Sequence, residues 1–177
     1  MVHLTLTKKM ADKFKIDTSK AFKDDTDLPE LDDWIVDDVW DSKRDPWVLF
    51  YHKPSTFSVI VQPDKYKLEH CADLCTMLIQ ELLIENDLFS RMHYFMQLFN
   101  KIQICRNNDK SSVAYMTQIK TAAYFGVHHP YTEHGVESLY ELMLYVNRDY
   151  RKKFNMAKKS IDVFLEMVSR VPPYIPE

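Results

Sequence analysis

Glycine is scarce in this sequence. Only two glycines, Gly126 and Gly135, occur among 177 residues. Loops of the GxGxxG and GxxxxGK[ST] types need several closely spaced glycines so that the backbone can approach a phosphate. The sequence therefore excludes both nucleotide-binding motifs.

Cysteines and long apolar runs are also few. The chain has three cysteines, at positions 71, 75 and 105, and its first ten residues, MVHLTLTKKM, lack the apolar core of a signal peptide. No stretch reaches the roughly 18 apolar residues that cross a membrane. We therefore expect a cytoplasmic protein with reduced thiols and no membrane contact.

The remaining composition is that of a globular protein. Hydrophobic residues make up 46%, aromatic residues 13% and charged residues 28% of the chain, and the net charge is -3. The length predicts one domain over residues 1–177. Its β-rich part covers 1–62, a mixed part covers 63–125, and a helical part covers 136–170.

Hydrophobic periodicity predicts the elements. Alternation over residues 2–6 and an apolar run over 47–51 indicate strands, and residues 56–62 complete a hairpin. Further strands are expected near 34–40 and 101–105, whereas helical spacing marks residues 68–82, 88–99, 113–119, 136–150 and 157–168. We expect an α+β fold in which an antiparallel sheet of about five strands is packed by helices, with a helical C-terminal half.

Acidic residues accumulate in one segment. Between Asp24 and Asp45 there are ten acidic residues and two basic ones. One interpretation is a solvated loop without a binding role. Another is a docking surface for a basic partner, because the segment also contains tryptophans, which often anchor interfaces. A third interpretation is mimicry of nucleic-acid phosphates. The residues assigned to partner binding are Asp32, Asp33, Trp34, Asp37, Asp38 and Trp40.

One loop has the residue types of a metal site. Residues 126–135 carry three imidazoles and a carboxylate, on His128, His129, Glu133 and His134. Imidazole and carboxylate groups bind divalent metals such as zinc, and imidazole also serves in acid–base catalysis. The spacing matches neither H-E-x-x-H nor H-x-x-E-H, so a polar connecting loop is the competing interpretation.

A basic segment follows. Between Arg148 and Lys159 there are six basic residues and one acidic residue, so this segment has the opposite charge to the acidic segment near the start of the chain. A nucleic-acid contact would use the four basic residues Arg148, Arg151, Lys152 and Lys153. The alternatives are a solvated helix face or a contact with the acidic segment, within one chain or between two copies.

No local signature indicates a nucleophilic enzyme. The G-x-S-x-G motif is absent, and Cys71 and Cys75 lie in register with a helical apolar stripe, where cysteine packs as a core residue. A Ser–His–Asp or Cys–His catalytic set formed in space stays open, because such residues meet without a sequence motif. We assign no catalytic residue.

Four segments in order carry a resemblance to a known family. They are Leu6-Thr7-Lys8-Lys9, the segment from Trp34, the apolar strand at 47–51 with the Thr56-Phe57-Ser58-Val59 strand, and the stretch from Arg106 to Met116. The chain resembles an uncharacterised family of small bacterial and phage or plasmid proteins, described as a domain of unknown function. It departs from that family at Leu6, where a cysteine is usual, and at Trp34-Ile-Val-Asp37, where W-H-A-N is usual.

The resemblance implies an intracellular protein, often encoded on mobile elements, and implies no activity. Our leading hypothesis is a non-catalytic protein–protein interaction or regulatory protein that modulates a host factor and needs no cofactor. Self-association is a further option. The alternative is a metal-dependent hydrolase or nuclease that uses the histidine loop.

Overall fold

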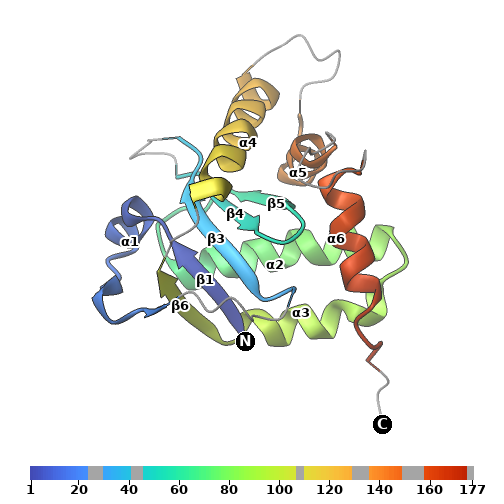
Figure 1. Ribbon diagram of the computed structural model, residues 1–177. Helices are drawn as coiled ribbons and strands as arrows, with labels where there is room; N and C mark the ends of the chain where they lie inside the picture. Colours follow the sequence, from blue (N-terminus) through green and yellow to red (C-terminus); the bar gives the residue numbers. More distant parts are fainter. Residues whose placement is uncertain (24–29, 41–45, 107–109, 129–135, 149–157, 175–177) are drawn as a thin grey trace.

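The computed structural model of the protein describes residues 1–23, 30–40, 46–106, 110–128, 136–148 and 158–174 (Figure 1). In these ranges, no helix combines the length and apolarity needed to span a membrane. The helices and strands appear in the following order: β1 (Val2–Leu6), α1 (Lys8–Phe14), η1 (Thr18–Lys20), β2 (Phe22–Lys23), β3 (Asp33–Asp38), β4 (Val48–His52), β5 (Ser58–Val61), α2 (Leu68–Glu85), η2 (Phe89–Arg91), α3 (Met92–Phe99), β6 (Ile102–Arg106), α4 (Lys110–His128), α5 (Leu139–Asn147) and α6 (Ser160–Ser169).

The strands form one six-stranded sheet in the order β2-β6-β1-β3-β4-β5. The expected α+β fold is confirmed, with the correction that the sheet is mixed rather than purely antiparallel. The β3-β4 and β4-β5 pairs are antiparallel, whereas β1 runs parallel to both β3 and β6, and β2 runs parallel to β6. Helices lie in the connections between the parallel strands, and a connection of that length allows the chain to return in the same direction.

Two hydrophobic clusters cover the two faces of the sheet. The larger joins Val2, Leu4 and Leu6 of β1 to apolar residues of α1, α2, α3 and α6. The smaller joins Ile35 and other residues of β3, β4 and β5 to α4 and α5. Figure 1 shows α4 and α5 on the side of the sheet away from α2 and α3. The alternation of β1 follows from this arrangement, since its apolar side chains face the larger cluster.

A buried asparagine closes part of the outer edge of β5. The Ser58 N–H donates to Oδ1 of Asn147 at 2.8 Å, and Nδ2 of Asn147 donates to the Ser58 carbonyl at 2.6 Å. Nδ2 also donates to the Met143 carbonyl within α5, at 2.7 Å. One amide therefore connects the end of α5 to the backbone of an edge strand.

Candidate functional site

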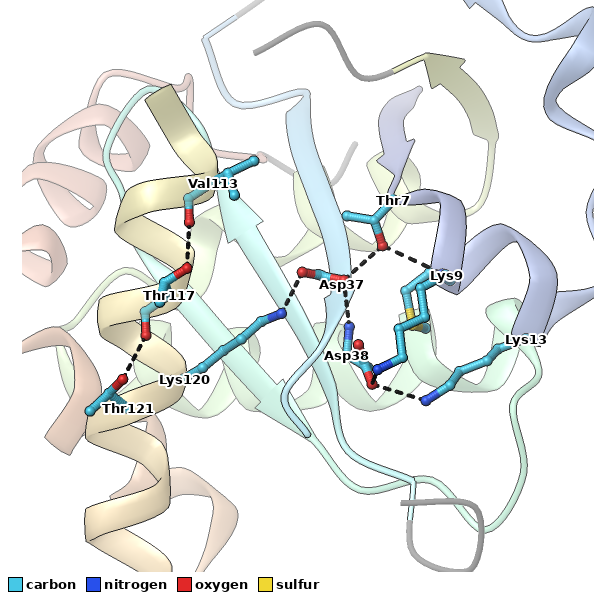
Figure 2. A network of polar contacts seen from close by, with 10 residues as sticks. Thr7, Lys9, Lys13, Asp37, Asp38, Val113, Thr117, Lys120 and Thr121 are labelled. Atoms are coloured by element: carbon cyan, nitrogen blue, oxygen red, sulfur yellow. Dashed lines mark hydrogen bonds and ion pairs between the residues drawn. The ribbon is translucent and has the colours of Figure 1, made fainter. Parts of the chain in front are cut away.

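Two consecutive carboxylates end β3 and connect the sheet to two helices (Figure 2). Asp37 accepts a hydrogen bond from the Thr7 hydroxyl at 2.7 Å and forms an ion pair with Lys120 of α4. Asp38 accepts from Lys9 at 2.9 Å and from Lys13 at 3.0 Å, both on α1. Because successive side chains of a strand point to opposite faces, the α1 lysines bind Asp38 and the α4 lysine binds Asp37.

The electrostatics of Asp38 favour its ionised form. Its side chain is only 4% exposed. Burial acts to raise the pKa of this carboxyl, but the hydrogen bonds and charges of Lys9 and Lys13 outweigh it, so the pKa lies below the ordinary value. For Lys13, burial acts to lower the pKa, and the contacts with Tyr66 and Asp38 outweigh that effect and raise it. Three lysines thus compensate the two aspartates.

Thr7 joins this network to the start of α1. Its hydroxyl oxygen accepts the backbone N–H of Met10 at 3.4 Å as the N-cap of α1, and the same hydroxyl donates to Asp37. The Thr-Lys-Lys segment that carried the family resemblance therefore supplies a cap and one of the Asp38 partners. Sequence reasoning did not assign Thr7, Lys9, Lys13 or Lys120 to a site, and only that short segment marked the first two.

The aspartates at the start of β3 are also engaged. Asp33 pairs with Lys53 at 2.7 Å, and Asp32 accepts from the Tyr94 hydroxyl at 2.9 Å. Burial raises the pKa of Asp32, and the Tyr94 hydrogen bond opposes that effect. Asp32 also lines a cavity of about 580 Å³ beside Tyr94 and Lys101.

Trp34 lies in the core rather than on a surface. Its side chain is 0% exposed, and its indole N–H donates to the Leu31 carbonyl at 2.9 Å. The ring packs against His52 with a centroid separation of 4.8 Å and against Phe164 at 6.0 Å. Trp34 and the four aspartates assigned to partner binding thus hold the fold together, and the structure does not bring them onto one exposed face.

Trp40, which was assigned to partner binding, and His128, which was assigned to the metal loop, lie next to each other. The Trp40 ring is 4.8 Å from Trp47 and 5.7 Å from His128, measured between ring centroids. His128, the last residue of α4, also contacts the ring of Tyr124 at 4.7 Å. The structure therefore forms a small aromatic group at the C-terminal end of α4.

The proposed metal loop and basic segment are only partly described. His129, Glu133 and His134 lie outside the described residues, as do Arg151, Lys152 and Lys153. In the described part of the chain, no group of three or more His, Cys, Asp or Glu side chains is arranged to hold a metal ion. Arg148 is described, and its guanidinium lies 4.2 Å above the Tyr145 ring.

The three cysteines are buried and act as core residues rather than as catalytic thiols. Burial raises the pKa of Cys71 to about 12 and that of Cys75 well above 9.0, so neither thiol forms a nucleophilic thiolate near neutral pH. Cys105 does meet an imidazole, with Sγ 3.7 Å from Nδ1 of His3, but the residue is only 1% exposed. A thiol enclosed to that degree is not open to a substrate.

The outward face of α4 differs from these engaged polar groups. Met116, Ile119 and Ala123 pack inward, whereas Thr117, Thr121 and Tyr124 are exposed. From Ser111 to His128 the sequence has one Lys and no Arg, Asp or Glu. That residue, Lys120, is committed to Asp37. A long exposed helical face with almost no charge is a typical feature of a contact surface.

Comparison with known proteins adds a family and no activity. No curated protein and no solved structure matches the chain. One family model matches residues 3–163, which is most of the sequence. The chain belongs to the family described as a domain of unknown function, DUF6933.

Proposed function

We propose that the protein acts without catalysis, by binding another protein chain through the exposed face of α4. The observation that carries this proposal is the exposed, nearly uncharged surface of that helix. Tyr124 is 51% exposed, Phe125 45% and Val113 46%, so three large apolar or aromatic side chains of this one helix are open to solvent. Tyrosine, the residue type at position 124, is enriched among the few residues that dominate the binding energy of protein interfaces.

The polar groups support the same conclusion. Asp37 and Asp38 at the carboxyl edge of β3 are held by lysines and by Thr7, so they connect elements of the fold. Groups that catalyse proton transfer need access to a substrate and a pKa suited to the task. Asp38 meets neither requirement, because its burial denies access to a substrate and its pKa lies below the ordinary value.

We place this action in the cytoplasm, in a protein of bacteria or their mobile elements that modulates a host factor. Support for the compartment comes from Cys71 and Cys75, which are thiols sealed in the core in an arrangement suited to a reducing environment. Support for the source is the family resemblance of the Thr7-Lys8-Lys9 and Thr56–Val59 segments. The metal-dependent hydrolase stays a prediction from the histidine loop.

The test is site-specific photo-cross-linking in cells that naturally make the protein. The cross-linking amino acid p-benzoylphenylalanine replaces Tyr124 in one variant and Phe89, which is 68% exposed on η2, in the control. We expect a discrete cross-linked protein from position 124, which disappears when Thr121→Lys is added, and none from position 89. Equal patterns from both positions, or a product indifferent to Thr121→Lys, would contradict the proposal.

A further inference from the structure

A cavity lies at the amino ends of the parallel strands β6, β1 and β3. Its volume of about 580 Å³ falls in the range of small-molecule sites, about 300–1,000 Å³. The residues directly before these three strands, Lys101, Met1 and Asp32, all line it. The opposite wall is one face of α3, with Tyr94, Gln97 and Leu98. Three adjacent strands and a helix thus enclose a space of the right size for a small organic molecule.

Asp32 presents an unused carboxylate oxygen to this cavity. The residue is only 7% exposed, and its Oδ1 accepts the Tyr94 hydroxyl at 2.9 Å. Within the described ranges of the chain, Oδ2 accepts no hydrogen bond, yet it is not sealed in the core. The Met1 amino group and the His3 ring act on the carboxylate through space alone. A buried carboxylate is costly unless donors or a positive charge compensate it, so this oxygen favours a ligand that supplies both.

The neighbouring aspartates show what Asp32 lacks. Asp33 pairs with Lys53 at 2.7 Å, and Asp37 pairs with Lys120. Among the described residues, no lysine or arginine pairs with Asp32. Burial outweighs the favourable contacts of its carboxyl and raises the pKa. The missing partner is therefore a positively charged donor, and the cavity has room for one that arrives on a ligand.

Lys101 gives the other side of the cavity a positive charge. The two residues flank β1, because the Lys101 carbonyl accepts the Val2 N–H at 2.9 Å. The Asp32 carbonyl accepts the His3 N–H at 2.8 Å. Two strand spacings, about 10 Å, thus separate their backbones. Lys101 is exposed and forms no ion pair within the described part of the chain. A polyamine would be repelled by this lysine, whereas a molecule with one amine and one acid group would gain a second ion pair.

We infer that this cavity binds a small zwitterion of the amino-acid class, with its ammonium group on Asp32 and its carboxylate toward Lys101. The ammonium group donates to Oδ2, while the Tyr94 hydroxyl holds Oδ1 in place. The side-chain amides of Gln97 and Asn100 also line the cavity and offer donors and acceptors. The site lies on the α3 side of the sheet, so it is separate from the α4 surface of the proposed function.

The first test changes the ligand and leaves the full wild-type chain as it is. Saturation-transfer difference NMR screens the twenty common L-amino acids one at a time. A chemical-shift titration then compares the best binder with its N-acetyl derivative and with the corresponding amine that lacks the carboxylate. Acetylation removes the positive charge and decarboxylation removes the negative one. We expect each change to weaken binding at least tenfold, because each removes a charge-assisted hydrogen bond.

The second test changes the protein. Asp32→Asn keeps an acceptor for the Tyr94 hydroxyl but removes the charge, and we expect it to weaken binding of the same amino acid at least tenfold. Asp33→Asn is the matched control, because its carboxylate pairs with Lys53 and does not line the cavity, and we expect unchanged binding. Circular dichroism and Tm verify that both variants are folded.

Four results would overturn the inference. They are the binding of no L-amino acid, equal binding of the N-acetyl derivative, equal binding of the amine without the carboxylate, and wild-type affinity in a folded Asp32→Asn variant. None of them affects the proposed function, whose cross-link from position 124 reports on the other side of the sheet.

Discussion

Replacing Asp38 by asparagine tests whether the lysine network stabilises the fold. The substitution keeps the shape of the side chain but removes the charge that Lys9 and Lys13 share, at 2.9 and 3.0 Å. A hydrogen bond to a charged group contributes about 1.5–3 kcal/mol, and breaking a buried pair costs about 3–5 kcal/mol. Lys9 is 45% exposed and returns to water, which reduces the loss.

We therefore expect Asp38→Asn to lower the free energy of unfolding by about 2–3 kcal/mol. For a chain of this size, that corresponds to a fall in Tm of about 4–12 °C. The measurement is thermal unfolding by circular dichroism at pH 7. The matched control is Glu166→Gln, which removes the pairs with Lys158 and Arg170 from a side chain that is 46% exposed, and we expect Tm to change little.

The same variant has a defined pH dependence. The pKa of the Asp38 carboxyl in the folded protein lies below its ordinary value of 3.8, so its contribution is complete above that value. As the pH falls through the folded-state pKa, the carboxyl gains a proton and the contribution is lost. The difference between wild type and Asp38→Asn should be constant near neutral pH and shrink in acid. Equal losses of Tm in Asp38→Asn and Glu166→Gln would refute the reasoning.

Two further predictions concern the core. Asn147→Ala leaves the Ser58 N–H and carbonyl without their amide partner, so we expect the free energy of unfolding, measured in urea, to fall by about 2–4 kcal/mol. The control Asn86→Ala, at an exposed position, should lower it far less. Similar losses in both variants would contradict the role of Asn147. Iodoacetamide at pH 8 should leave Cys71 and Cys75 unmodified in the folded protein and modify both in urea, as read by peptide mass spectrometry, because burial raises the pKa of Cys71 to about 12 and excludes the reagent. Rapid modification of the folded protein would contradict that burial.

Local patterns predicted the elements better than their assembly. The alternation of β1, the β4–β5 hairpin and α2 follow directly from apolar spacing and a turn. Strand direction does not, because it depends on which distant strands pair. Thus β6 joins β1 in parallel over Val2–Leu6, and no feature of either segment alone sets that direction.

Two boundaries show why local signals mislead. Asn86 and Asp87 are residue types that commonly start a helix. Here the Asn86 amide donates to the Leu82 carbonyl at 2.8 Å and Asp87 has a φ of 57°, so they end α2. Gly126 predicts a loop, yet α4 continues through it to His128. A Cβ at Gly126 would lie 3.2 Å from side chains of Leu142 and Tyr145, so glycine there permits the close contact with α5.

The candidate site was harder to predict than the fold. The acidic segment attracted a docking hypothesis because charge alone does not show burial. Asp37 and Asp38 find their lysines on α1 and α4, and Lys120 lies 83 residues away from Asp37 in sequence. The α4 face that we propose as a contact surface carries no sequence motif. Its distinguishing feature is a near absence of charged residues, which gains meaning only when the exposure of each side chain is known.

The amide of Asn147 has a consequence for how this sheet meets other chains. It occupies the outward N–H and carbonyl of Ser58, the two groups that an added strand would use at that point. At the opposite edge of the sheet, the described part of β2 covers Phe22–Lys23. With Ser58 occupied, an added strand cannot form its usual backbone pairing with β5 at that residue, and this hinders edge-to-edge growth of the sheet at that position.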